Sequence, residues 1–382
     1  MRSVRCRTYR TGLLLAGLIS FCLMIGGPAA WAAAPSECSW QFTTVDAGIG
    51  EYGGFTSLAL DAQEHPHIAY FDYVALALLY THWDGAQWQV ETVDTGGTGA
   101  FASLALDADN QPHISYYDGA NGDLKYAYKS GGVWHKEIVD ETGNTGYYTS
   151  LALDGLERPQ IAYLSVTSGS VLYARWDGTK WQKETIEAVG TDLDTVRTMS
   201  LAVDNQNYPH LSYYREYDAN LRYAYKDAAG WHKETVDSTN DKGKNSSLAL
   251  DANGYPHIAY RDSTGNHLLY ARWTGTAWEK TSVDAYGDVG WYPSLVLGAQ
   301  GARYVAYRDL DNGALKFAYW DGSAWQRETV DNHDNAGGFV SLAIDASGRP
   351  HIAYTRFDSQ SAHYARCASP ESRVYLPLIR RR

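Results

Sequence analysis

Short apolar runs alternate with turn residues along almost the whole chain. Between residues 247 and 284, four such runs rich in Tyr, Ile, Leu, Trp and Val are separated by turns at 252–256, 263–266 and 274–275. Each run is about five to seven residues long, which is the length of a strand and too short for a helix. The residues also suit a pleated, half-buried surface. The stretch therefore predicts an antiparallel meander of four strands, named a to d in chain order.

This meander repeats with a period of about 47 residues, and four-strand units at such a period are typical of propeller blades. The Ser that opens strand a occurs seven times, at Ser57, Ser103, Ser150, Ser200, Ser247, Ser294 and Ser341. The Trp that opens strand d follows it six times, and the remaining copy is Trp40, near the other end of the chain. The sequence thus predicts an all-β fold, a seven-bladed β-propeller over residues 35–367, closed by the N-terminal strand joining the last blade.

Two cysteines stand at the ends of this repeat array. Cys38 precedes Trp40 by two residues, and Cys367 takes the place of the Trp that ends strand c in other repeats. In an intact blade a short turn joins these two positions, whereas in the last blade the chain ends interrupt it. We therefore expect a Cys38–Cys367 disulfide to replace the missing link. Two unpaired thiols are the alternative.

The first 34 residues have the pattern of a secretory signal peptide, with four Arg, an apolar run over residues 13–25 and small residues at 30–32. The apolar run is shorter than the roughly 20 residues of a membrane helix, so we expect cleavage and no membrane span. Removal of the first 34 residues changes the formal net charge from −12 to −16, which argues against nucleic acid as a partner. We expect a secreted or cell-surface monomer whose tail, residues 368–382, is either a sorting signal or a disordered end.

Two polar residues recur in most repeats. Asp closes strand a at Asp61, Asp107, Asp154, Asp204, Asp251 and Asp345, and His opens strand b at His67, His113, His210, His257 and His351. A ring of carboxylates could hold a metal and a set of histidines could be catalytic, but residues present in nearly every blade are usually structural. We interpret each Asp as the cap of its own a–b turn and each His as part of the repeated core. The sequence therefore predicts no metal, no cofactor and no catalytic residue.

The repeat S-L-A-L-D…P-H-I-A-Y-x-D…L-x-Y-A-x-W-D-G-x-x-W-x-x-E-T-V-D resembles that of secreted bacterial seven-bladed propellers, over residues 40–367. The turn at residues 176–181 is similar to an Asp-box of sialidase-type propellers, although its Asp and Gly are adjacent and the arginine-bearing sialidase opening is absent. The Trp- and Tyr-rich blades are similar to fucose-binding lectin propellers, and in shape to propeller polysaccharide lyases. These resemblances imply an extracellular protein that binds carbohydrate.

Departures from the repeat indicate where a specific site could lie. Three residues before the Ser of strand a, four consecutive blades carry large side chains, namely Tyr147, Arg197, Lys244 and Trp291. At the end of strand b, on the same face, stand Arg215, Arg261, Arg308, Tyr117 and Tyr214. Aromatic faces stack on sugar rings, and Arg pairs with carboxylates. We predict that these nine residues, the mouth residues, form a ligand site; scattered side chains without a common ligand are the alternative.

The sequence favours a lectin-like binding module for extracellular glycans, with acidic sugars preferred by the cations of the mouth. A polysaccharide lyase or glycoside hydrolase is the second hypothesis, although no unique His and no pair of carboxylates stands out from the repeat. A structural or protein-binding scaffold is the third.

Overall fold

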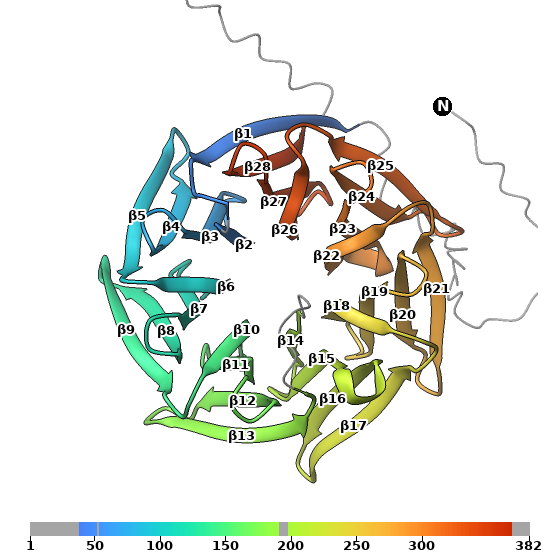
Figure 1. Cartoon of the computed structure of the whole chain (residues 1–382), viewed down its shortest axis with the longest axis horizontal. Helices are drawn as coiled ribbons and strands as arrows, with labels where there is room; N and C mark the ends of the chain where they lie inside the picture. The colour runs from blue at the N-terminus through green and yellow to red at the C-terminus, as the bar shows by residue number, and fades with distance from the viewer. Residues whose placement is uncertain (1–37, 52, 191–197, 369–382) are drawn as a thin grey trace, which may run out of the picture. The chain divides into compact units, whose positions relative to one another are not determined.

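The computed structural model describes residues 38–51, 53–190 and 198–368, which form a ring of seven β-sheets (Figure 1). The predicted signal peptide, nearly all of the C-terminal tail and Arg197 lie outside these residues. Each sheet has four antiparallel strands, so the predicted seven-bladed all-β propeller is confirmed. In the part of the chain that the structure describes, no helix is long and apolar enough to cross a membrane.

Six blades follow one another along the chain, each with its first strand nearest the centre of the ring and its fourth at the outside (Figure 1). Blade 1 holds β2 (Gly54–Leu60), β3 (Pro66–Asp72), β4 (Ala77–Trp83) and β5 (Trp88–Thr95). Blade 2 holds β6 (Thr98–Leu106), β7 (Pro112–Asp118), β8 (Asp123–Ser130) and β9 (Val133–Asp140). Blade 3 holds β10 (Thr145–Leu153), β11 (Pro159–Ser165), β12 (Ser170–Trp176) and β13 (Trp181–Ala188).

The next three blades repeat this order. Blade 4 holds β14 (Ser200–Val203), β15 (Pro209–Arg215), the 3-10 helix η1 (Glu216–Asp218), β16 (Asn220–Asp227) and β17 (Gly230–Asp237). Blade 5 holds β18 (Lys242–Leu250), β19 (Pro256–Asp262), β20 (His267–Trp273) and β21 (Trp278–Asp284). Blade 6 holds β22 (Val289–Leu297), the 3-10 helix η2 (Ala299–Gly301), β23 (Arg303–Asp309), β24 (Ala314–Trp320) and β25 (Trp325–Asp331).

Blade 7 combines strands from both ends of the described chain. It holds β26 (Ala336–Ile344), β27 (Pro350–Arg356), β28 (Ser361–Ala368) and β1 (Ser39–Ala47). Strand β1 runs antiparallel to β28, with Trp40 opposite Cys367 and Asp46 opposite Ala362, so residues 40–46 pair where the repeat predicted. The expected Cys38–Cys367 disulfide is confirmed and links residues that are 329 positions apart in the sequence.

Adjacent blades are held together by a repeated aromatic contact. The Trp that opens each outer strand packs edge-on against an aromatic ring of the preceding blade, with ring centres 5.3–5.8 Å apart. The pairs are Trp88–Tyr364, Trp134–Tyr80, Trp181–Tyr126, Trp231–Tyr173, Trp278–Tyr223, Trp325–Tyr270 and Trp40–Phe317. The hydrophobic cores therefore lie between blades; one of them joins Val93 of β5 to Leu104 and Ile114 of blade 2.

A side-chain hydrogen bond also crosses every blade boundary. The Tyr in the middle of each second strand donates its hydroxyl to the acidic residue near the end of the preceding outer strand, over 2.6–2.9 Å. The pairs are Tyr70–Asp46, Tyr116–Asp94, Tyr163–Asp140, Tyr213–Glu187, Tyr260–Asp237, Tyr307–Asp284 and Tyr354–Asp331. Burial alone would raise the pKa of Asp94, but hydrogen bonds from Lys125, Lys136 and Tyr116 outweigh it and lower that pKa.

The recurring Asp and His residues are structural, as the repeat indicated. Asp61 Oδ1 accepts the backbone N–H groups of Gln63 and His65 at 2.8 and 2.7 Å, which caps the turn between β2 and β3. His67 Nδ1 lies 2.5 Å from the hydroxyl oxygen of Tyr80 within the same blade. The same cap and the same pair recur in the other blades that carry these residues.

Acidification is expected to destabilise the propeller in two stages. Burial lowers the pKa of the paired histidines, and for His257 burial together with the charge of Arg303 lowers it to about 4. In the unfolded chain these histidines bind protons near pH 6.5, whereas in the folded protein they do so only at lower pH. The free energy of unfolding therefore falls as the pH drops from about 6.5 to about 4. Five of the carboxylates that accept a Tyr hydroxyl at a blade boundary, Asp94, Asp140, Asp237, Asp284 and Asp331, have lowered pKa values. Their contribution to the free energy of unfolding is therefore present above about pH 3.9 and is lost below it.

His257→Gln tests the first stage. Blade 3 carries Gln160 at the equivalent position, where its side-chain oxygen accepts the Tyr173 hydroxyl at 2.7 Å, so Gln keeps the hydrogen bond and removes the titration. Between pH 6.5 and 4 the free energy of unfolding should therefore fall by roughly 3 kcal/mol less in the variant than in the parent, at about 1.4 kcal/mol per pKa unit. Urea denaturation across this pH range measures the change, and an unaltered pH dependence contradicts the assignment.

Candidate functional site: the central cavity

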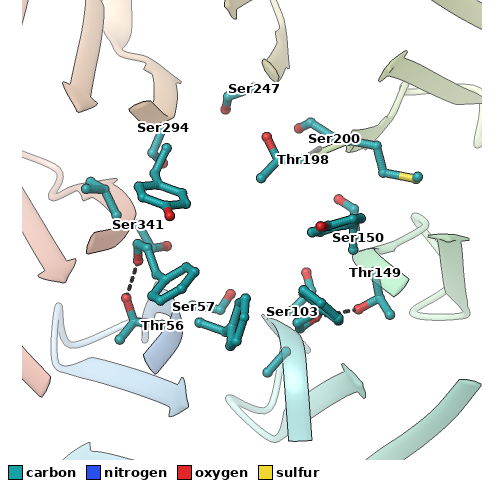
Figure 2. Close-up of a pocket in the computed structure, with 18 of the residues that line it drawn as sticks. Thr56, Ser57, Ser103, Thr149, Ser150, Thr198, Ser200, Ser247, Ser294 and Ser341 are labelled. Atoms are coloured by element: carbon teal, nitrogen blue, oxygen red, sulfur yellow. Dashed lines mark hydrogen bonds between the residues drawn. The ribbon is translucent and has the colours of Figure 1, made fainter. Parts of the chain in front are cut away.

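The inner strands surround a cavity of about 230 Å³ at the centre of the ring (Figure 2). All seven blades contribute to its lining, each with the Ser that opens strand a and with residues just before it. Figure 2 shows the seven Ser side chains distributed around this space. Equivalent positions of all seven repeats therefore converge on this cavity.

Five consecutive blades contribute an aromatic residue to the cavity, two positions before the Ser. We call Tyr292, Phe339, Phe55, Phe101 and Tyr148 the aromatic arc. Their φ angles lie between +46° and +57°, a region that bulky residues rarely adopt and that costs about 1–3 kcal/mol each. In each of these blades the pairing register shifts just before the Ser. Such β-bulges re-aim side chains, and here they turn aromatic rings toward the cavity.

The rings of the aromatic arc contact one another in blade order. Ring centres are 4.9 Å apart for Tyr292 and Phe339 and 4.1 Å for Phe339 and Phe55. The series continues with 4.6 Å for Phe55 and Phe101 and 4.5 Å for Phe101 and Tyr148. Each ring is only half-buried, so the arc forms a continuous apolar wall on one side of the cavity.

Serine hydroxyls supply hydrogen-bonding groups beside this wall. At six blade boundaries the Oγ of the strand-a Ser in one blade accepts a backbone N–H from the next blade, over 2.9–3.0 Å. The donor is the residue that directly follows the strand-a Ser of that next blade. These hydroxyls belong to Ser57, Ser103, Ser150, Ser247, Ser294 and Ser341. A hydroxyl that accepts can still donate its proton, and among residues 38–51, 53–190 and 198–368 no acceptor takes it. Within the part of the chain that the structure describes, these six hydroxyls can therefore each donate a hydrogen bond to a ligand.

Blades 4 and 5 interrupt the aromatic arc with polar residues. Thr198 and Asn245 stand where the other blades have an aromatic ring, and Asn245 Oδ1 accepts the backbone N–H of Tyr292 at 3.2 Å.

Among the described residues that line the cavity there is no Asp, Glu, His, Lys or Arg. Burial raises the pKa of Tyr292, which keeps its hydroxyl protonated at neutral pH. The cavity thus combines an apolar wall with uncharged hydrogen-bonding groups.

The described mouth residues do not line this cavity. Trp291 Nε1 donates to Asp288 Oδ1 at 2.7 Å, and the Arg261 guanidinium stacks 4.3 Å from the centre of the Trp291 ring. Arg261 is 3% exposed, and its Nη1 lies 2.7 Å from Asp288 Oδ1. Arg308 is 6% exposed, stacks over Phe357 and donates to Asn335 Oδ1 at 2.6 Å. Both guanidinium groups connect blade 6 to a neighbouring blade.

The other mouth residues also have partners within the protein. Tyr147 and Tyr117 have ring centres 4.4 Å apart, and the Tyr117 hydroxyl donates to Asn144 Oδ1 at 2.8 Å. Lys244 Nζ lies 2.6 Å from Asp241 Oδ2 and 5.9 Å from the centre of the buried Tyr214 ring. Arg215 Nη1 donates to Asp218 Oδ2 at 2.9 Å. The structure therefore brings the described mouth residues together as local pairs.

The sequence pattern did not identify the aromatic arc: the predicted site residues stand three positions before the Ser, whereas the rings that line the cavity stand two positions before it. A regular strand alternates its side chains between two faces, so a shift of one residue exchanges the faces. The bulge before each Ser breaks this alternation, and the rings point into the cavity from the position after Gly54, Ala100, Tyr147, Trp291 and Gly338. The recurrence of Phe or Tyr at this position in five blades was the available signal.

No family model and no curated protein sequence matches this chain. Its fold matches solved propellers. The Aleuria aurantia lectin, solved with Fucα1-6GlcNAc, aligns with a TM-score of 0.50 and 12% identity over 75% of this chain and 98% of the lectin. The polysaccharide lyase Uly1 aligns with a TM-score of 0.50 and 10% identity over 81% of this chain and 89% of the lyase. The NanB sialidase of Streptococcus pneumoniae aligns with a TM-score of 0.48 and 10% identity, over 86% and 71% of the two chains. At these identities the likeness is one of fold.

Proposed function

We propose that this propeller is an extracellular carbohydrate-binding module whose central cavity takes a sugar without cleaving it. The observation that carries the proposal is the aromatic arc beside six serine hydroxyls with spare protons. A sugar ring has an apolar C–H face that stacks on aromatic rings and a hydroxyl edge that needs hydrogen-bonding partners. The cavity offers both kinds of surface from adjoining walls. A confirmed disulfide supports an oxidising, extracellular location.

Binding without chemistry fits this cavity better than hydrolysis or elimination does. A hydrolase of the common kind uses two carboxyl groups, and a lyase needs a base near its substrate. Among the described lining residues there is no carboxylate, imidazole or amine, and burial raises the pKa of Tyr292, one of the two tyrosines in the lining. The absence of charge in the lining also favours a neutral sugar at this position.

Phe101→Ala tests the proposal, because Phe101 contacts the rings of both Phe55 and Tyr148. A glycan array on the parent protein would identify a neutral ligand, and calorimetry would compare the variants. We expect Phe101→Ala to weaken binding by about 1–3 kcal/mol, the usual range for an aromatic anchor. Phe42→Ala, which removes a 45% exposed ring from the outer strand β1, is the matched control and should bind like the parent.

Trp291→Ala separates the cavity from the predicted mouth site. If binding depends on Trp291 and not on Phe101, the ligand lies at the mouth residues and the cavity assignment is wrong. If no glycan binds the parent protein, the carbohydrate proposal is wrong, and a structural or protein-binding scaffold becomes the favoured hypothesis. Thermal melting of each variant shows whether the fold survives the substitution.

A further inference from the structure

A second cavity, of about 750 Å³, lies between blades 5 and 6. Its walls are the β18–β19 and β20–β21 turns of blade 5 and the β22–β23 turn of blade 6, which contains η2. These turns lie at the opposite ends of the strands from the residues that line the central cavity. The second cavity is therefore a separate site.

Blade 6 departs from the repeat at this wall. The first residue of the second strand is Pro in six blades and Arg303 in blade 6. In the other blades an Asp caps the turn after the first strand, and a His or Gln on the second strand forms a hydrogen bond with a Tyr on the third strand. Blade 6 has Gly298, Tyr304 and Phe317 at these three positions. Because Phe317 has no hydroxyl, that bond cannot form in blade 6. The repeated core therefore does not require an arginine at position 303.

The Arg303 guanidinium lies against two aromatic rings. Its central carbon lies 5.3 Å from the centre of the Trp320 ring and 5.5 Å from that of Tyr270. Its Nε is buried without a hydrogen-bond partner, and within the described ranges no carboxylate forms an ion pair with Arg303. Burial lowers the pKa of this guanidinium. A partly desolvated cation without an acceptor is costly, and an anionic ligand would supply the missing acceptor.

The other charges of the cavity are already satisfied. Arg272 Nη2 donates to Glu279 Oε2 at 2.7 Å, and Asp251 Oδ1 accepts the backbone N–H groups of Asn253 and Tyr255 at 2.8 and 2.9 Å. The lining thus holds two cations, Arg272 and Arg303, and two carboxylates, Asp251 and Glu279. Among the described residues Arg303 is the cation of this wall that forms no ion pair, in a chain whose formal net charge is −12. General attraction of anions to this protein is excluded by that net charge, so anion binding here would be local.

The remaining lining matches a sugar ring. Tyr255, which is 38% exposed, and the partly buried Trp273 present aromatic surface to the cavity. The side-chain amides of Asn253 and Gln300 are exposed and can both donate to and accept from hydroxyl groups. We propose that the cavity between blades 5 and 6 binds an acidic saccharide, with its carboxylate on Arg303 and its ring against Tyr255 or Trp273.

Arg303→Gln tests this inference with two probes, methyl glucuronide and its neutral counterpart methyl glucoside, measured by calorimetry or by NMR titration. We expect the parent to bind the glucuronide and the variant to bind it at least about tenfold more weakly, because the charge-assisted hydrogen bonds to the carboxylate are lost. Any binding of the glucoside should be unchanged. Raising the salt concentration should weaken glucuronide binding to the parent.

The chain provides a backbone-compatible second variant and a matched control. Arg303→Pro restores the residue of the other six blades, so it keeps the test valid if Arg303→Gln does not fold. Arg158→Gln alters a guanidinium in the cavity between blades 3 and 4, where Asp154 Oδ2 already lies 2.7 Å from Arg158 Nη2, and should leave glucuronide binding unchanged.

Four outcomes would overturn the inference. They are no glucuronide binding by the parent, unchanged binding in both Arg303 variants, an equal loss in Arg158→Gln, and acetate binding as tight as that of the glucuronide. The last result would indicate a simple anion site without recognition of the sugar. Phe101→Ala should retain glucuronide binding, so failure of the central-cavity proposal is distinguishable from failure of this one.

Discussion

Replacing Cys38 and Cys367 by Ala is expected to lower the free energy of unfolding by roughly 5 kcal/mol, near the upper end of what disulfides contribute. The bond links residues 329 positions apart, so it restricts almost the entire repeat array in the unfolded state. In the entropy model the stabilisation grows with the logarithm of the loop length. The bond also joins the ends of β1 and β28, the one strand pair of blade 7 without a connecting turn.

Denaturant unfolding of the oxidised parent and of the double variant measures this contribution. Adding a reductant should bring the midpoint of the parent down to that of the double variant and should leave the double variant unchanged. Blade 7 should melt first in the variant, which hydrogen exchange in β1 would detect. Equal stability of the oxidised parent and the double variant would show that the strand pairing alone holds the two ends together.

Asp284→Ala is expected to cost about 3–5 kcal/mol, the range for removing one partner from a buried ion pair. Asp284 is fully buried and accepts the Tyr307 hydroxyl at 2.7 Å, and Lys316 Nζ lies 2.5 Å from the same oxygen. Arg327 Nη1 lies 3.4 Å from its other oxygen. Without the carboxylate, two cations and a hydroxyl at the boundary between blades 5 and 6 lose their shared acceptor.

The chain itself provides a matched control for this prediction. Asp46 occupies the equivalent position in blade 7 and accepts the Tyr70 hydroxyl at 2.8 Å, but within the described residues it forms no ion pair with Lys or Arg. We expect Asp46→Ala to cost only about 1 kcal/mol, the value of a single hydrogen bond. Adding Lys316→Met to Asp284→Ala should recover part of the loss. Equal costs at the two positions, measured by urea denaturation, would contradict the role assigned to the cations.

The sequence determined the fold because the blade is a local unit that repeats. Strand length, turn residues and the recurring Ser and Trp residues are visible within any stretch of about 47 residues, and seven copies identify the propeller. The position of Trp40 and the two cysteines indicated the composition of blade 7 for the same reason. The repeated Asp and His residues could be interpreted as structural because their partners lie within their own blade.

Only the tertiary structure decided how side chains meet across blades and which of them enter a cavity. The hydrogen bonds between Tyr and Asp or Glu at the boundaries join residues 22–26 positions apart in adjacent blades, and no local pattern indicates such a pairing. The aromatic arc depends on a bulge that shifts the side-chain alternation by one residue, which regular strand periodicity cannot anticipate. Arg261 and Arg303 are both arginines on the second strand of a blade. Asp288 forms an ion pair with Arg261, whereas no described carboxylate forms one with Arg303. That difference arises from packing between blades, since the sequence shows that an arginine is present but not which groups surround its charge.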